Sequence, residues 1–201
     1  SEYVKATIKC LNSFWEFNPE YSARLWLDAE IWPLRKYITS KLDRPTQAEF
    51  SEIPDITKEW QWNKLLIILE HLGTEDIFSD ADIIWNGPLP LFQKPAFFLK
   101  EFDLMLRAAT RHLLGFLPLK GHQPTFMFNV SFVQLKNLSR EETLIKLSKD
   151  FYKVVRSCIA DEVIGYDDIA PMKRMSEQIA LSLAVQNLLG DDIDVLKSQD
   201  S

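Results

Sequence analysis

The sequence predicts a mainly α-helical protein, an irregular multi-helix bundle with at most one short β element. Apolar residues recur at steps of three and four along most of the 201 residues, which is the period of an amphipathic helix. Capping residues, prolines and glycines stand at the ends of these periodic stretches, where helices begin and end. The composition agrees, because 46% hydrophobic residues, with 13 Phe and 6 Trp against 6 Gly, indicate a well-filled interior.

Two helices are predicted in the first 42 residues. The first covers residues 2–17, and its apolar positions are Val4, Ile8, Leu11 and Trp15. Asn18 and Pro19 resemble a cap followed by a first-turn proline, and they predict the start of a second helix. The apolar stripe of this second helix is Leu27, Ile31, Leu34, Ile38 and Leu42. Pro33 lacks a backbone donor and crowds the preceding turn, so we expect a kink or a break there.

The middle of the chain predicts two helices separated by a loop. A helix is expected over residues 55–72, where Gly73 is a suitable terminator. Residues 74–94 have no helical period and contain several prolines, so they predict a loop, although many of its side chains are apolar. A long helix is then expected from Pro95 to about residue 114.

The last third predicts one strand and two helices. Residues 126–133 alternate with period two on their Phe and Val side, which is typical of a half-buried strand. Such a strand needs a partner, either residues 116–119 or a second chain, and a short helix is the competing interpretation. Ser139 and Glu142 form a capping box that begins a helix, and a final helix is expected over residues 170–189.

Composition also bounds the domain organisation and the partners. No repeat or linker divides the chain, so we expect one helical domain over residues 1–190 and a frayed acidic tail over residues 191–201. The net charge of -6 opposes nonspecific binding to phosphate backbones, so nucleic acid is not an expected partner. No apolar run reaches the roughly 18 residues that a membrane span needs.

The cysteines and histidines predict neither a disulfide framework nor a metal centre. Cys10 and Cys158 each lie among apolar residues, which favours buried free thiols and an intracellular, cytoplasmic location; one disulfide between them is the alternative. His71, His112 and His122 lie on different predicted elements, and neither cysteine has a CxxC partner. Glycine-rich phosphate loops are missing too. We therefore expect no metal and no cofactor, and the sequence does not favour an enzyme.

One pair of residues does fit a catalytic pattern. Arg107 and His112 have an Arg-x4-His spacing on a predicted helix, which resembles the short motif of the HEPN ribonuclease superfamily, although Ala108 stands where that family commonly has a polar residue. The resemblance covers six residues and implies metal-independent RNA cleavage in a homodimer. A five-residue step places the two side chains about 140 degrees apart on a regular helix. The structural alternative is an exposed Asp103–Arg107 pair and a hydrogen-bonded histidine.

An apolar loop supplies the preferred site, which we expect to bind another protein. Its predicted partner-binding residues are Trp85, Leu89, Leu91 and Phe92. Two prolines restrict this loop, and preorganised aromatic and aliphatic anchors are typical of binding hot spots. The alternative is that the loop covers the core. The first functional hypothesis is therefore a non-catalytic protein-protein interaction or regulatory domain; the others are the ribonuclease and an enzyme or carrier for an apolar small molecule.

Overall fold

The computed structural model describes residues 2–53, 59–99, 121, 128–138, 140–160, 173, 175–190 and 192–196. The chain divides into two compact units. Unit 1 comprises Ser1–Lys58 and Ser79–Leu91, and unit 2 comprises Glu59–Phe78 and Phe92–Ser201. Within the described ranges, no helix has both the length and the apolarity needed to cross a membrane.

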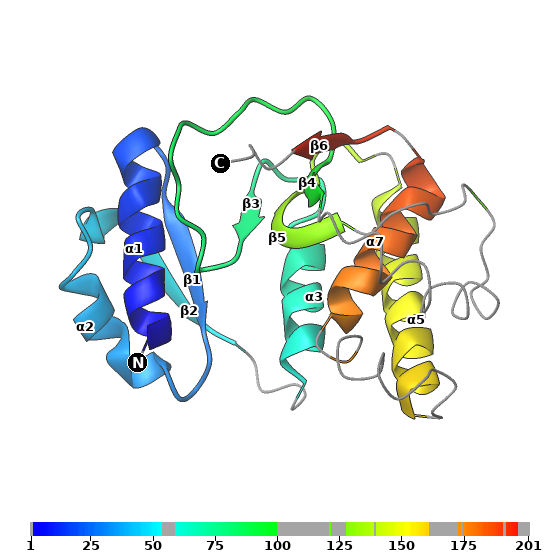
Figure 1. The fold of residues 1–201 in the computed structure, drawn as a ribbon, viewed down its shortest axis with the longest axis horizontal. Helices are drawn as coiled ribbons and strands as arrows, with labels where there is room; N and C mark the ends of the chain where they lie inside the picture. The colour runs from blue at the N-terminus through cyan, green and yellow to red at the C-terminus, as the bar shows by residue number, and fades with distance from the viewer. Residues whose placement is uncertain are drawn as a thin grey trace. The chain divides into compact units, whose positions relative to one another are not determined.

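The predicted fold class is wrong, because the protein is a mixed α/β protein and not an all-α helical bundle. The described residues contain six strands in two sheets (Figure 1). The first sheet pairs β1 with β2, and the second has the order β3-β5-β4-β6. Several segments predicted as helices or as loop therefore contribute strands.

Unit 1 begins with the helix that the sequence predicts. Helix α1 covers Glu2–Phe17, which confirms the predicted bounds. It buries Val4, Cys10, Leu11 and Trp15. These positions lie on one side of a helix, since they follow steps of six, one and four residues. The amphipathic pattern was therefore sufficient to define this element.

The predicted second helix is largely wrong. Strand β1 (Ala23–Leu27) occupies its first part, and after the 3-10 turn η1 (Trp32–Leu34) only the short helix α2 (Arg35–Thr39) remains. A second 3-10 turn, η2 (Pro45–Gln47), precedes β2 (Ala48–Glu52). The two strands are parallel, with Leu25 opposite Phe50. This is a β-α-β connection, and the strands of a parallel pair need such a crossover.

The core of unit 1 explains why the stripe was misinterpreted. Leu25 and Leu27 are both buried, and they lie two residues apart on one face of β1. Ile38 and Leu42 pack into the same cluster from α2 and its end. Leu27, Ile38 and Leu42 therefore do share a core, but a strand and a helix bring them there. Pro33 lies in η1, just before α2 begins, where a break was expected.

Unit 2 contains the larger hydrophobic cluster, built on three helices. Helix α3 covers Trp60–Glu70, α5 covers Glu141–Ala160 and α7 covers Ser176–Leu189. Helix α7 contacts both α3 and α5 and lies between them (Figure 1). Twelve of its residues are buried, from Ser176 to Asn187. Gly190 follows α7 with φ +58, a backbone conformation that favours glycine, and the helix ends there.

The sheet of unit 2 corrects two predictions and confirms a third. Strand β3 (Ile77–Ser79) lies within the predicted loop, and β4 (Ala96–Leu99) replaces the start of the long helix predicted from Pro95. Strand β5 (Phe128–Gln134) confirms the predicted strand. Its antiparallel partner is β4, a segment that was not considered as a partner from the sequence. Strand β6 (Asp194–Leu196), in the predicted tail, pairs in parallel with β4.

Candidate functional site

Residues Ser79–Leu91 belong to unit 1 and contact α1, and we call them the strap. The burial of its residues alternates: Ile83, Trp85 and Leu89 are half-buried, whereas Ile84 and Pro88 are exposed. Such an alternation is the pattern of extended chain, in which successive side chains point to opposite sides. The strap therefore turns one set of side chains toward the unit and presents the other set to solvent.

Side chains of α1 and its end hold the strap in place. The Trp85 backbone N–H donates to Ser13 Oγ at 3.0 Å, and the Leu89 N–H donates to Asn18 Oδ1 at 2.8 Å. The Trp85 ring meets Phe14 edge-to-face, with ring centroids 5.2 Å apart. An aromatic pair of this kind contributes about 0.5–1.5 kcal/mol beyond the area it buries. The strap is thus fixed at two backbone positions and one aromatic contact.

Asn18, predicted as a helix-opening cap, acts in a different way. Its side-chain amide donates to the Phe14 carbonyl at 3.0 Å at the end of α1, while its side-chain oxygen accepts from Leu89. Asn18 is buried, so both polar ends of the amide need such partners. The residue therefore closes α1 and anchors the strap.

Cys10 lies beneath the strap, on the same helix. Its thiol donates to the Asp80 carbonyl over 3.8 Å, and both Cys10 and Cys158 are buried free thiols, as the sequence predicts. Burial raises the pKa of Cys10, an effect opposed by contacts with the Trp85 side chain and the Ile83 backbone. Because the thiolate is the reactive form, burial beneath the strap lowers the reactivity of the Cys10 thiol.

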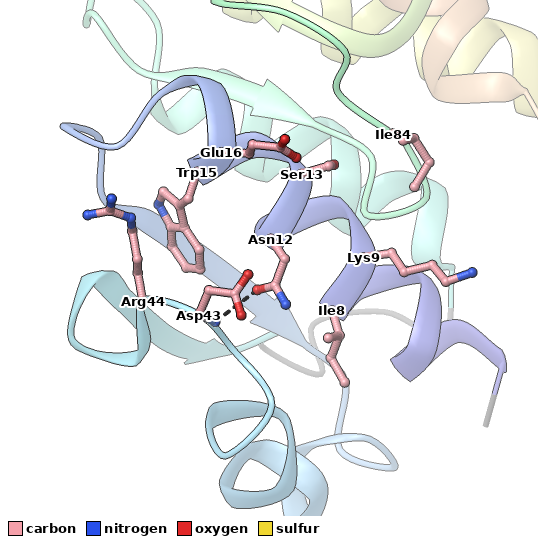
Figure 2. Close-up of a pocket in the computed structure, with 9 residues that line it drawn as sticks. All are labelled: Ile8, Lys9, Asn12, Ser13, Trp15, Glu16, Asp43, Arg44 and Ile84. Carbon is pink, nitrogen blue, oxygen red and sulfur yellow. Dashed lines mark hydrogen bonds between the residues drawn. The ribbon is translucent and has the colours of Figure 1, made fainter.

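An open groove of about 710 Å³ is lined by residues of α1, of the loop after α2 and of the strap. Figure 2 shows Ile84 of the strap on one side of this helix and Asp43 and Arg44 on the other. The complete lining is Ile8, Lys9, Asn12, Ser13, Trp15, Glu16, Asp43, Arg44 and Ile84. The lining mixes apolar and charged groups, and the groove is open. These features suit a protein segment, whereas a small hydrophobic molecule needs an enclosed apolar pocket.

Asn12 holds the loop that carries Asp43 and Arg44, which forms one wall of the groove. Its side-chain amide donates to the Lys41 carbonyl at 3.2 Å, and its side-chain oxygen accepts the Asp43 N–H at 3.0 Å (Figure 2). One side chain therefore ties the loop after α2 to the middle of α1. The groove lining contains two basic residues, Lys9 and Arg44, and two acidic residues, Glu16 and Asp43.

The four predicted partner-binding residues take different positions. Trp85 and Leu89 are half-buried and hold the strap on α1. Leu91 is 88% exposed. Phe92 is buried in unit 2, where its ring lies 5.6 Å from that of Phe132. Ile84, at 60% exposure, was not predicted as a contact residue. Ile83, Ile84 and Trp85 are consecutive apolar residues, so the sequence does not show which of them faces solvent.

The catalytic alternative falls outside this part of the chain. Arg107 and His112 lie outside the described residues, so the HEPN-like pair stays a prediction. Among the residues that the structure describes, no group of three or more His, Cys, Asp and Glu side chains is placed to hold a metal ion.

Glu59, Tyr152 and Arg156 form a polar cluster in unit 2. Glu59 accepts hydrogen bonds from the Tyr152 hydroxyl at 2.9 Å and from Arg156 Nη2 at 2.6 Å. Burial, with the adjacent Glu59 carboxylate, raises the pKa of Tyr152. The phenol therefore stays protonated at neutral pH and serves as a hydrogen-bond donor. Through these hydrogen bonds the cluster holds the start of α3 against α5.

Comparison of the chain with protein-family models, with curated proteins and with solved structures found no match. The groove in unit 1 and the residues that shape it are therefore the basis for a functional assignment.

Proposed function

We propose that this protein is a non-catalytic protein-protein interaction domain whose unit 1 binds a segment of another protein in the groove along α1. The observation that carries the proposal is the position of Ile84. Its neighbour Trp85 is fixed to α1 by a backbone hydrogen bond and a ring contact, whereas the Ile84 side chain is 60% exposed at the rim of the groove.

The energetics of such a site favour binding. Complete burial of a fully exposed isoleucine contributes about 1.5–3 kcal/mol, so burying the exposed 60% of Ile84 contributes about 1–2 kcal/mol, near the lower limit of a hot-spot residue. The strap is already held in one arrangement by Ser13 and Asn18, so a partner need not order it. Leu91, which the sequence predicts as a contact, is a second exposed apolar side chain at the end of the strap.

Affinity purification from the source cells, with quantitative mass spectrometry, tests this proposal. The full chain carries either Ile84→Asp or, as a matched control, Trp60→Asp in unit 2, where Trp60 has a similar exposure of 57%. We expect a protein that is recovered with the wild type and the control but is depleted on the order of tenfold or more with Ile84→Asp. The purified protein should show the same ranking of dissociation constants.

Circular dichroism and thermal unfolding establish that both variants are folded. If no recovered protein depends on Ile84 in a folded variant, the groove is not the binding site and the proposal is wrong.

A further inference from the structure

The chain around α2 carries more basic than acidic residues, unlike the sequence as a whole. The whole sequence carries 29 acidic against 23 basic residues, whereas residues 34–44 contain four basic residues and one acidic one. The basic residues are Arg35, Lys36, Lys41 and Arg44, and the acidic one is Asp43. We call residues 34–44 the basic segment. It comprises α2 and the loop that walls the groove.

Most of this positive charge is unneutralised. Arg35 is engaged locally, with its guanidinium 4.7 Å from the Trp32 ring centroid and hydrogen-bonded to the Trp32 carbonyl. Lys36 and Lys41 are exposed, and neither forms an ion pair with a residue that the structure describes. Lys41 Nζ lies 6.0 Å from the Tyr37 ring centroid.

Arg44 completes this set of exposed cations. Its guanidinium reaches only the Pro19 carbonyl, at 3.5 Å, and the described residues offer it no carboxylate within ion-pair distance. A hydrogen bond of that length is at the weak end of the range. The basic segment therefore presents three cations to solvent next to the exposed apolar side chains of Leu34 and Tyr37.

The basic segment is continuous with the groove. Asn12 holds the backbone of Lys41 and Asp43 against α1, and Arg44 lines the groove itself (Figure 2). The groove lining has as many basic as acidic residues. The excess positive charge of the basic segment is therefore on Lys36 and Lys41, which do not line the groove. Because Asn12 holds the Lys41 backbone against α1, a bound segment that extends over this wall would leave the balanced groove and meet this excess.

We infer that the segment bound in the groove belongs to an acidic protein partner, with aliphatic side chains against Ile84 and carboxylates over Arg44, Lys41 and Lys36. This inference rests on the proposed function. Electrostatic complementarity of this kind raises association rates and selects between partners. Apolar residues of the partner that lie between its carboxylates would pack against the exposed side chains of Leu34 and Tyr37.

An acidic peptide fits this surface better than a nucleic acid or a membrane does. Charges in water act over a screening length of about 8 Å at physiological ionic strength, so a short peptide responds mainly to the local cations. A phosphate backbone or an anionic lipid surface spans more of the molecule, whose net charge is -6. Asp43 and Glu16, which line the groove, also oppose a continuous row of phosphates.

Selection of random 16-residue peptides by phage display on the full chain tests the inference. Enriched peptides are synthesised and titrated by fluorescence anisotropy against the wild type, Ile84→Asp, Lys36→Glu and a Lys41→Glu/Arg44→Glu double variant. Lys153→Glu on α5 is the charge control, because Lys153 is an exposed cation in unit 2. Circular dichroism confirms that each variant is folded.

We expect the enriched peptides to be net acidic with aliphatic residues. Their affinity should fall on the order of tenfold in the double variant, less in Lys36→Glu and not at all in Lys153→Glu, and should weaken as salt rises. Neutral or basic peptides that need Ile84 but tolerate the double variant would overturn the acidic partner and leave the proposed function standing. If no peptide depends on Ile84, both are wrong.

Two further probes separate the other polyanions. Vesicles of equal phosphatidylcholine and phosphatidylserine, and a 20-nucleotide single-stranded RNA, are titrated in the same buffer. Tighter binding of either probe than of every selected peptide, with loss in the double variant, would assign the basic segment to a membrane or a nucleic acid and overturn the inference.

Discussion

At the scale of single residues, the Ser13 hydroxyl holds the middle of the strap. Its oxygen accepts the Trp85 N–H at 3.0 Å and its own proton is donated to the Cys10 carbonyl at 2.9 Å. The same residue thus joins the strap to the helix turn that carries the buried thiol. Cys10 can consequently report whether the strap is open.

Ser13→Ala should therefore accelerate alkylation of Cys10. Loss of one hydrogen bond is worth about 1 kcal/mol, which corresponds to about a fivefold increase in the open population. Peptide mapping after iodoacetamide treatment measures the rate at each thiol. Cys158, buried in unit 2, is the internal control and should react at an unchanged rate. Equal acceleration at both thiols would instead indicate global destabilisation.

Tyr152 provides a pH-dependent contribution to stability. Its pKa is raised in the folded protein, because burial and the Glu59 carboxylate disfavour the phenolate. Below the unfolded pKa of about 10 this contribution is fully present, and it is lost as pH rises above that value.

The free energy of unfolding should therefore fall between pH 9 and pH 11 more steeply in the wild type than in Tyr152→Phe. At neutral pH the variant should be less stable by about 1 kcal/mol, since it loses a hydrogen bond to a partly exposed carboxylate. Urea unfolding at each pH measures both effects. Parallel pH profiles for the two proteins would show that other groups cause the loss.

At the scale of elements, α7 supports β5 through polar side chains. Ser182 Oγ accepts the Phe128 N–H at 2.9 Å and lies 3.3 Å from the Phe128 carbonyl, to which it can donate. One turn earlier, Gln178 Oε1 accepts the Val130 N–H at 3.5 Å. Buried polar residues on α7 thereby satisfy backbone groups of a neighbouring strand, which explains their place in an otherwise apolar helix.

Ser182→Ala should destabilise the protein by about 1–3 kcal/mol, because it removes a buried partner of the β5 backbone. Ser148→Ala on α5 is a closely matched control. Its hydroxyl is also fully buried, but it has no hydrogen-bond partner in the described part of the chain. The control should be neutral or slightly stabilising. If the two variants lose equal stability in chemical denaturation, the bonds to β5 contribute nothing measurable.

At the scale of the whole molecule, each unit has its own hydrophobic cluster. Ile38 is fully buried in the cluster of unit 1 and Leu65 is fully buried in that of unit 2. A large-to-small substitution at such a position costs about 2–5 kcal/mol. Because the clusters are separate, we expect each substitution to destabilise only the unit that contains it.

Hydrogen exchange with mass spectrometry measures where the loss falls. Ile38→Ala should increase exchange in α1, β1 and β2 and leave α5 and α7 protected, and Leu65→Ala should do the reverse. If either substitution increases exchange equally in both units, they unfold as one cooperative domain, which is the organisation that the sequence predicts.

The sequence alone determined the elements whose signals are local. Residues 2–17 have a helical period and no competing pattern, and α1 has those bounds. The alternation of residues 126–133 likewise predicts β5, although its pairing with β4 was not predicted. The apolar loop was also chosen from local features, its prolines and its Trp, Leu and Phe side chains, and its binding role stays a prediction. These cases depend on steps of a few residues, which a sequence shows directly.

Tertiary contacts decided the rest. Leu25 and Leu27 suit a strand or a helix, and only parallel pairing with residues 48–52 makes them a strand. Ala96 to Leu99 form β4 because β5 and β6 pair with them from far along the chain. The groove depends on contacts from Asn12 to Lys41 and from Ser13 to Trp85, which join residues 29 and 72 positions apart. Backbone pairing and side-chain contacts over such separations leave no local period, so the structure alone placed Ile84 and Arg44 on either side of α1.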